Sequence, residues 1–192
     1  METFKFEEPT IERKEDAIDY IREHLKYNSD INGSGGLDRY IDNYEEWLVK
    51  LENDKTKIPD ENRVPGLTYF LVREEDNKII GMINIRLVLN EKLRKSGGHI
   101  GYGIRPTERK KGYNKINLYL GLQVCQKYGL DKVLLDADLD NPASWRTMEA
   151  LGGTRIETYY DENYQCDCVK YEIDVEKSLK NNEKTYANQI KR

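Results

Sequence analysis

The sequence contains few cysteines and histidines. Its 192 residues include three cysteines and two histidines, too few for a disulfide framework, so we expect a reducing compartment. Cys166 and Cys168 stand two apart on an expected strand and therefore point to one face. This spacing is not a usual zinc pattern, and we expect no metal site. Cys125 falls inside an expected helix and is interpreted as a small buried hydrophobic residue.

The chain also lacks an excess of positive charge and any long apolar run. Its net charge is −4, which argues against general binding to nucleic acid or to an anionic membrane. No stretch has the length and apolarity of a signal peptide or of a membrane span. We therefore expect a cytoplasmic protein that binds neither nucleic acid nor membrane.

Length and periodicity favour one domain of the α/β class. We assign residues 1–176 to a single domain and residues 177–192 to a polar C-terminal tail, either a frayed helix or disordered. The loop at 28–36 is either a lid or a plain surface loop. The expected elements, in chain order, are strand 4–6, helices 15–26 and 37–51, strands 67–72, 78–89 and 99–105, helix 115–128, strand 132–136, a helix from 142 to about 151, and strands 154–160 and 164–175.

The most informative segment joins the strand at 99–105 to the helix at 115–128. A short basic turn, Arg109-Lys-Lys-Gly112, stands directly before that helix. Free backbone N–H groups and the positive end of the helix dipole converge at such a point, which favours a phosphate group. Because the rest of the chain is acidic, this local positive charge predicts a small anionic ligand. The helical crossover also predicts that strands 99–105 and 132–136 are parallel.

This segment resembles the GNAT superfamily of acyl-CoA-dependent N-acyltransferases. The superfamily has Arg or Gln, two residues, Gly, one residue, then Gly or Ala, and this chain has Arg109, Gly112 and Asn114 at those places. Asn141-Pro-Ala-Ser144 and a helix ending Leu-Gly-Gly153 provide a second match. The resemblance covers about residues 66–175, and Gly-Gly-His-Ile-Gly-Tyr around His99 is similar to a bacterial subgroup of unassigned substrate.

The resemblance implies a GNAT fold and an acetyl-CoA-dependent reaction. The fold is a mixed, mostly antiparallel sheet of six to seven strands with one parallel splayed strand pair, flanked by about four helices. The reaction is direct transfer of the acetyl group to a primary amine of a small molecule or peptide in a ternary complex. A homodimer is the common assembly for soluble homo-oligomers.

Eleven residues are expected at the acetyl-CoA site. Asn114 departs from the family pattern and brings bulk close to the phosphates. Asn141 is alternatively a simple helix cap, and Lys110 and Lys111 are alternatively solvated lysines. The expected cofactor-binding residues are Gly103, Ile104, Arg105, Arg109, Lys110, Lys111, Gly112, Tyr113, Asn114, Asn141 and Ser144.

The catalytic residues are less clearly indicated. The family often uses a tyrosine as the acid, seven residues after the Asn, where this chain has Met148. His99 is the candidate general base, because it titrates near neutrality, or else a half-buried structural histidine. Tyr102 is a candidate catalytic residue and substrate contact. Tyr159, Tyr160 and Tyr171 are candidate substitute acids, and nothing in the sequence selects one of them. Arg86, Asp136 and Asp138 are candidates for the substrate, and they and Tyr102 each have a surface or capping role as the alternative.

Two other functions remain open. The first is a non-catalytic acyl-CoA-binding sensor of the same fold, which Met148 and Asn114 keep possible. The second is a doubly wound nucleotide-binding protein. A Gly-x-Gly before Gly112 is missing and an antiparallel meander precedes the turn, and both features argue against that fold.

Overall fold

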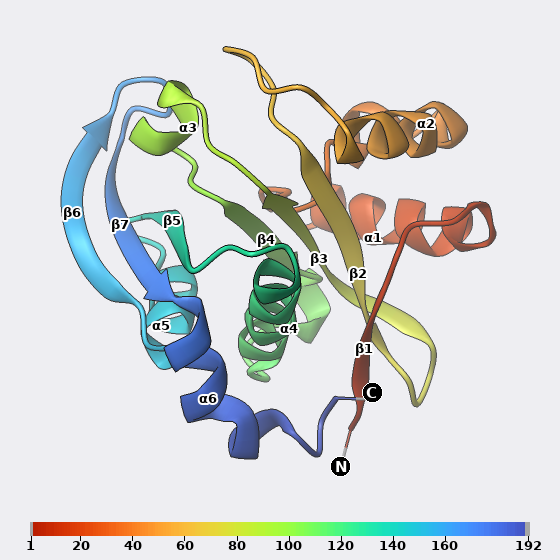
Figure 1. Cartoon of the computed structure of the whole chain (residues 1–192). Coiled ribbons are helices and arrows are strands. Elements are labelled where there is room, and N and C mark those ends of the chain that lie inside the picture. Colours follow the sequence, from red (N-terminus) through yellow and green to blue (C-terminus); the bar gives the residue numbers. More distant parts are fainter. Residues whose placement is uncertain (1, 191–192) are drawn as a thin grey trace.

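Two antiparallel sheets form the framework of the molecule. The computed structural model describes residues 2–190. The α/β class is confirmed, with seven strands in sheets of four and three within the described chain. The sheet orders are β1-β2-β3-β4, formed by Phe4–Glu7, Gly66–Arg73, Lys78–Arg86 and Ile100–Ile104, and β5-β7-β6, formed by Lys132–Asp138, Cys166–Asp174 and Thr154–Asp161 (Figure 1).

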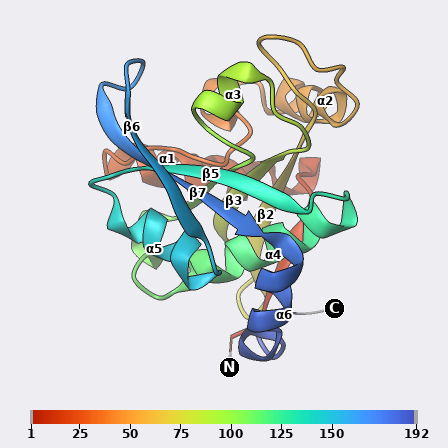
Figure 2. The same cartoon turned by 60° about the vertical axis from the view of Figure 1, so that its left-hand side comes forward.

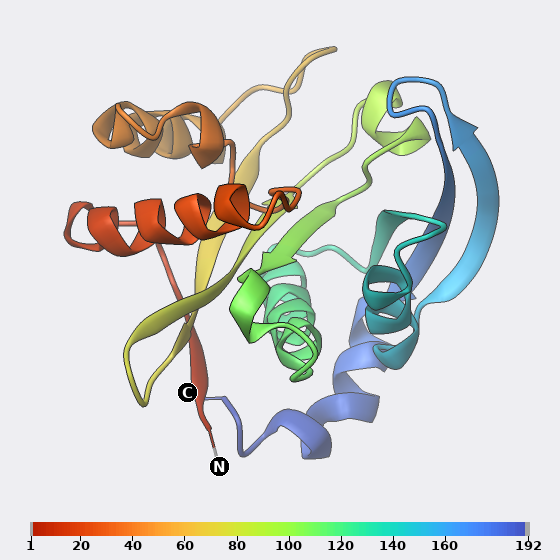
Figure 3. The same ribbon diagram turned by 180° about the vertical axis from the view of Figure 1, so that it is seen from behind.

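Helices cover both faces of the four-stranded sheet. Helices α1 (Lys14–Lys26) and α2 (Tyr44–Lys55) lie together on one face, where they pack with Trp47 and Phe70 in one apolar cluster (Figure 3). Helix α4 (Tyr113–Lys127) lies on the opposite face and packs with the second sheet in a larger cluster. The remaining helices are α3 (Glu91–Lys95), α5 (Pro142–Ala150) and α6 (Val175–Tyr186).

The expected helix at 37–51 is wrong at its start. Gly36 has a φ of 85°, and residues Leu37–Arg39 form one 3₁₀ turn before α2 begins at Tyr44. The apolar periodicity extends upstream of the helix because Leu37 is buried in the same cluster as Trp47. A hydrogen bond from Trp47 Nε1 to the carbonyl of Gly35 (3.2 Å) holds that segment in place.

The predicted parallel strand pair is not formed. Strands β4 and β5 belong to different sheets, and in Figure 2 the three-stranded sheet comes forward, with β5 and β7 crossing in front of β2 and β3. Among residues 2–190, a single hydrogen bond between backbone groups joins the start of β4 to β5. It runs from His99 N to Leu134 O (2.7 Å). The His99 ring accepts the Leu134 N–H at Nδ1 (2.9 Å), so the amide that would continue a ladder is already bonded.

The C-terminal segment contains a packed helix. Helix α6 takes in most of the expected tail, and Leu179 and Tyr186 are buried against the larger cluster. Tyr186 lies 4.8 Å from Tyr119 of α4, ring centre to ring centre. Residues 191 and 192 of that tail lie outside the described residues. Within the described part of the chain, every helix is too short or too polar to cross a membrane.

Candidate active site

Strand β4 leaves one edge without a strand partner. It is the last strand of its sheet, after β3. Arg105 N donates to Ile80 O (2.8 Å), and alternate residues of an antiparallel strand face opposite edges. The backbone groups of Tyr102 and Ile104 therefore face the free edge. This edge can accept an extended ligand as an added strand, at the position predicted for the pantetheine arm.

The loop at 28–36 packs against the face of β4. The backbone of Gly33 is so close to the strand that a Cβ there would lie 2.7 Å from the Cα of Tyr102. A Cβ on Gly103 would lie 2.8 Å from the carbonyl oxygen of Asn32. Glycine in β4 thus permits this contact, and the loop borders the edge strand on the side of α1.

The basic turn before α4 has the backbone shape of an anion-binding loop. Lys110 and Gly112 both have positive φ, 65° and 86°, and Gly112 is the N-terminal cap of α4. Lys115 N donates to Gly112 O (3.0 Å), which leaves the amides of residues 112–114 without acceptors inside the helix. Space is open where a Cβ on Gly112 would stand. Among residues 2–190, the exposed Lys110 side chain has no hydrogen bond or ion pair.

The neighbouring cations hold this turn in place. Arg109 donates from Nε to Ile104 O (3.0 Å) and from Nη2 to Ser29 Oγ (2.6 Å). Lys111 pairs with Glu108 at 2.8 Å. Burial alone would raise the pKa of Glu108, but hydrogen bonds from Lys111 and Arg73 outweigh it and lower the pKa to about 2. Lys110 is therefore the cation of this turn that remains free for a ligand.

Three residues predicted at the cofactor site have their side chains elsewhere. Arg105 is 2% exposed and pairs with Asp19 (2.6 Å) and Glu23 (2.9 Å) of α1. Tyr113 is buried, and its hydroxyl donates to Glu2 (2.6 Å). Asn114 is half-buried, and its Oδ1 is buried without a hydrogen-bond partner.

The start of α5 is joined to β4 through Tyr102. Asn141 Oδ1 accepts the Ser144 N–H (3.3 Å), so Asn141 acts as a helix cap. The Tyr102 hydroxyl lies 3.2 Å from both the carbonyl and the Oγ of Ser144. Burial raises the pKa of Tyr102 and keeps the phenol protonated. The structure thus brings these three predicted residues together beside the free edge of β4.

His99 lies immediately before β4, and its ring binds Leu134. Burial, followed by repulsion from Arg94 and Arg86, lowers the pKa of His99 to about 4. The ring is therefore neutral at pH 7, and because Nδ1 accepts the Leu134 N–H, the proton lies on Nε2. No lone pair is left for a substrate proton. This geometry favours the structural role over the general-base role.

The predicted substrate residues Arg86 and Asp136 meet at the turn before His99. Arg86 Nη1 donates to the carbonyls of Gly97 (3.0 Å) and Gly98 (2.8 Å), and Asp136 Oδ2 accepts the Gly97 N–H (2.6 Å). The other oxygen of Asp136 is buried without a partner. Burial raises the pKa of Asp136, although the Gly97 bond opposes this. Asp138 lies two residues further along, beside the thiols of β7.

The substitute acids lie in different environments. Met148 is 1% exposed and belongs to the apolar core. Tyr171 donates to Glu149 (2.8 Å), whereas Tyr160 is 58% exposed. The hydroxyl of Tyr159 is buried without a hydrogen-bond partner, and its ring lies 4.7 Å from the ammonium of Lys170.

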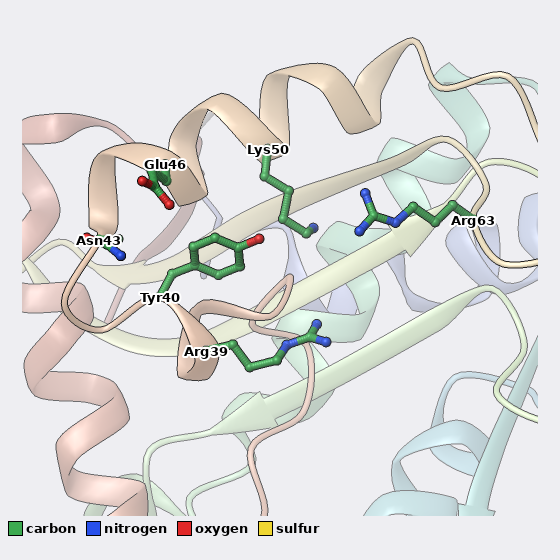
Figure 4. A pocket seen from close by; sticks show the side chains of 6 residues that line it. All are labelled: Arg39, Tyr40, Asn43, Glu46, Lys50 and Arg63. Carbon is green, nitrogen blue, oxygen red and sulfur yellow. The ribbon is translucent and has the colours of Figure 1, made fainter.

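A cationic groove on α2 was missed by the sequence analysis. Its volume is about 330 Å³, and Figure 4 shows charged side chains around the hydroxyl of Tyr40. The signal was present as Asn43, Glu46 and Lys50, which stand three and four apart on one helix face. The lining residues are Arg39, Tyr40, Asn43, Glu46, Lys50 and Arg63.

Comparisons with known proteins agree with this architecture. The model of the acetyltransferase (GNAT) family matches residues 37–152, more than half of the chain. No curated protein matches the sequence.

Three solved structures show the similarity of fold. Ribosomal-protein-S5-alanine acetyltransferase from Vibrio fischeri aligns with a TM-score of 0.66 and 14% identity, over 91% of this chain and 94% of its own. A spermidine N-acetyltransferase chimera from Vibrio cholerae and hSSAT gives 0.67 and 16%, over 92% and 98%. RimJ from Mycobacterium smegmatis, in complex with CoA-disulfide, gives 0.65 and 16%, over 92% and 87%. At these identities the likeness concerns the fold alone.

Proposed function

Because the chain belongs to the GNAT family and is an acetyl-CoA-dependent acetyltransferase, we propose that it acetylates a primary amine of a small molecule or peptide directly. The observation that carries the proposal is the free edge of β4 beside the open N-terminus of α4.

The turn at 109–112 would hold the pyrophosphate. Three amides without helical acceptors, the helix dipole and the unpaired Lys110 supply donors and positive charge. Arg109 and Lys111 act on the ligand indirectly, because their side chains fix the turn.

The backbone of β4 would bind the pantetheine arm. The N–H and C=O groups of Tyr102 and the N–H of Ile104 face the free edge, so they can pair with the amides of the arm as a neighbouring strand would, whereas Ile104 O already accepts from Arg109. Asn141 and Ser144, at the start of α5, lie beside this edge. Such pairing orients the thioester for attack without a covalent enzyme intermediate.

Two side chains remain for the chemistry. Asp136 Oδ1 is a buried acceptor without a partner, and we assign to it the binding of the acceptor amine and the removal of its proton. Tyr102 is protonated and lies at the β4 edge, and we assign to it the proton for the departing thiolate. His99 positions β4 against β5 in this proposal.

A thiol-release assay with the full chain and acetyl-CoA tests the proposed reaction. The amine panel contains polyamines as well as amines that carry a carboxylate or phosphate, because the groove on α2 is lined by Arg39, Lys50 and Arg63 together with the carboxylate of Glu46. We expect amine-dependent release of CoA above the hydrolysis blank and an acetylated product by mass. Acetyl-CoA binding without release for any amine would instead favour the non-catalytic binding module.

Two variants in the same assay test the assigned roles. Asp136→Asn keeps an acceptor for the Gly97 N–H, and we expect it to lower kcat/KM for the amine by about 100-fold, whereas Asp131→Asn leaves it unchanged. Tyr102→Phe is expected to lower kcat by a similar factor of about 100 with little change in the KM for acetyl-CoA. Unchanged kinetics would refute the role of the residue concerned.

A further inference from the structure

Two thiols and a carboxylate meet at the end of the three-stranded sheet. Cys168 of β7 stands opposite Asp138 of β5 in the strand register. Cys166 lies two residues earlier on β7 and so shares a face with Cys168. Their ligand atoms all lie within 4.8 Å of one another. We propose that Asp138, Cys166 and Cys168 form a binding site for a thiophilic divalent cation of the zinc class.

The distances between these atoms fit one face of a zinc tetrahedron. Zn–S bonds of about 2.3 Å and Zn–O bonds of about 2.0 Å at tetrahedral angles require S···S of about 3.8 Å and S···O of about 3.5 Å. The two sulfurs are 3.6 Å apart. Asp138 Oδ1 lies 3.5 Å from the sulfur of Cys166 and 3.9 Å from that of Cys168. A cation can therefore enter with only small movements of the side chains.

The backbone that carries the ligands is regular and fixed. All three residues lie within paired strands, where β5 and β7 are joined from Lys132 to Asp138. The chain just beyond is tied in the same way, since Leu139 N donates to Asp167 O (2.8 Å). Ligands on paired strands are held at a constant separation, which reduces the ordering cost of binding.

The cluster is open to solvent on one side. Cys168 is 5% exposed, Cys166 is half-buried and Asp138 is exposed. A hollow of about 340 Å³, lined by Leu139, Asp140, Cys166 and Asp167, adjoins it. A hydrated cation can thus reach the thiols, and a water molecule can keep the fourth position. The carboxylates of Asp140 and Asp167 add negative charge along the entry path.

The donor set selects the class of metal. Thiolates favour Zn²⁺ and similar soft cations over Mg²⁺, Ca²⁺ and Mn²⁺, which prefer oxygen ligands. Each cysteine releases its thiol proton to solvent when it binds the metal, and Asp138 supplies a carboxylate oxygen as the third ligand atom. The third ligand, Asp138, comes from a different strand. The Cys-x-Cys spacing in the sequence therefore does not by itself reveal the site.

Titration of the reduced, chelator-treated full chain with Co²⁺ tests this site. Co²⁺ is the probe because thiolate ligation gives it a charge-transfer band and intense visible bands, and Zn²⁺ should then displace it. We expect one Co²⁺ per chain. Cys166→Ala and Cys168→Ala should each remove the charge-transfer intensity of one thiolate, and Asp138→Asn should weaken binding by about tenfold or more. Cys125→Ala, which removes the buried thiol of α4, is the matched control and should bind as the parent does.

Several outcomes would overturn the site. The site is refuted if the reduced chain shows no thiolate-to-cobalt band, or if Cys166→Ala or Cys168→Ala leaves that band undiminished. It is also refuted if Asp138→Asn binds Co²⁺ with the affinity of the parent. Formation of a Cys166–Cys168 disulfide in a chain that binds no Co²⁺ when reduced would likewise replace the metal site with a redox pair. Far-UV circular dichroism of each variant confirms that the fold is retained, so a loss of binding reports on the ligands.

Discussion

At the scale of single residues, most polar atoms of the active site are bonded to other parts of the chain. Arg109 and Lys111 hold their own turn, and Arg86 holds the turn before His99. The exceptions include Lys110, whose side chain is without a partner among residues 2–190, and three buried atoms without a hydrogen-bond partner: Asp136 Oδ1, Asn114 Oδ1 and the Tyr159 hydroxyl. Groups left unpaired within a well-bonded site are the ones available to ligands.

His99 should make stability depend on pH in a defined window. Its pKa is about 4 in the folded chain and about 6.5 when unfolded, so the unfolded state binds more protons between these values. The contribution of His99 to the free energy of unfolding is therefore fully present above pH 6.5 and falls as the pH drops towards 4. His99→Asn can still accept the Leu134 N–H and should lose this slope, as measured by urea unfolding across the window.

The same variant separates the two roles of His99. If His99 is a positioning residue, His99→Asn retains most of the transfer rate at pH 7. His99→Leu leaves the Leu134 N–H unpaired and should cost about 1–3 kcal/mol of stability. A rate loss of about 100-fold in His99→Asn with unchanged stability would restore the general-base role.

Sequence reasoning located the basic turn before α4 but not the state of its side chains. The glycine at 112 and the run of cations are visible in the sequence, because the required φ and charge belong to those residue types. That Lys111 is paired and Lys110 is free depends on Glu108, whose burial follows from contacts with Arg73 of a distant strand. Local patterns do not encode such pairings.

At the scale of elements, the active-site edge depends on one loop and on the separation of two strands. The loop at 28–36 packs against β4, and β4 meets β5 through His99 and Leu134 alone among the described backbone bonds. The separation beyond that contact leaves the edge of β4 unpaired.

Close packing of this loop predicts a steric cost at Gly33. Gly33 and Gly129 have the same φ of 75°, but a Cβ on Gly33 would lie 2.7 Å from the Cα of Tyr102 in β4, whereas nothing lies within 4 Å at Gly129. Gly129→Ala should lose about 1–2 kcal/mol of stability from the backbone alone. Gly33→Ala should lose about 3 kcal/mol or more, since the clash adds to it. Equal losses in denaturant titrations would show that the loop does not rest on β4.

Most elements were predictable because their periodicity matches their burial. The meander of β2 to β4 and the helix α4 follow directly from alternation and from apolar spacing. The prediction of a parallel strand pair was wrong for a local reason. The Gly98 N–H donates to Leu93 O and the ring of His99 accepts the Leu134 N–H, so these groups do not join the two strands as a ladder, and a rule about crossover connections does not include such local bonds.

At the scale of the whole molecule, the two sheets share one core that α4 and α6 complete. The larger cluster contains residues of β3, β4, β5 and β7 together with both helices. Helix α6 therefore stabilises the fold although its sequence is largely polar, because its few apolar residues lie on one face. Composition alone suggested a tail.

Loss of the α6 contact should destabilise the whole chain. Leu179 is buried in the shared core, and Leu179→Ala is expected to cost about 2–3 kcal/mol. Leu25→Ala is the matched control, since Leu25 is 58% exposed and should change stability by less than about 0.5 kcal/mol. A single cooperative unfolding transition that shifts in Leu179→Ala but not in Leu25→Ala supports one shared core. A separate early transition would mean that α6 unfolds independently.

The most direct test of the account is calorimetric titration of the protein with acetyl-CoA. We predict saturable binding that weakens about tenfold in Lys110→Asn, because the free cation is lost while asparagine tolerates the positive φ of that position. Lys127→Asn, with the same change of charge at the far end of α4, should bind as the parent does. No binding, or equal binding by all three proteins, would contradict the placement of acetyl-CoA at this turn.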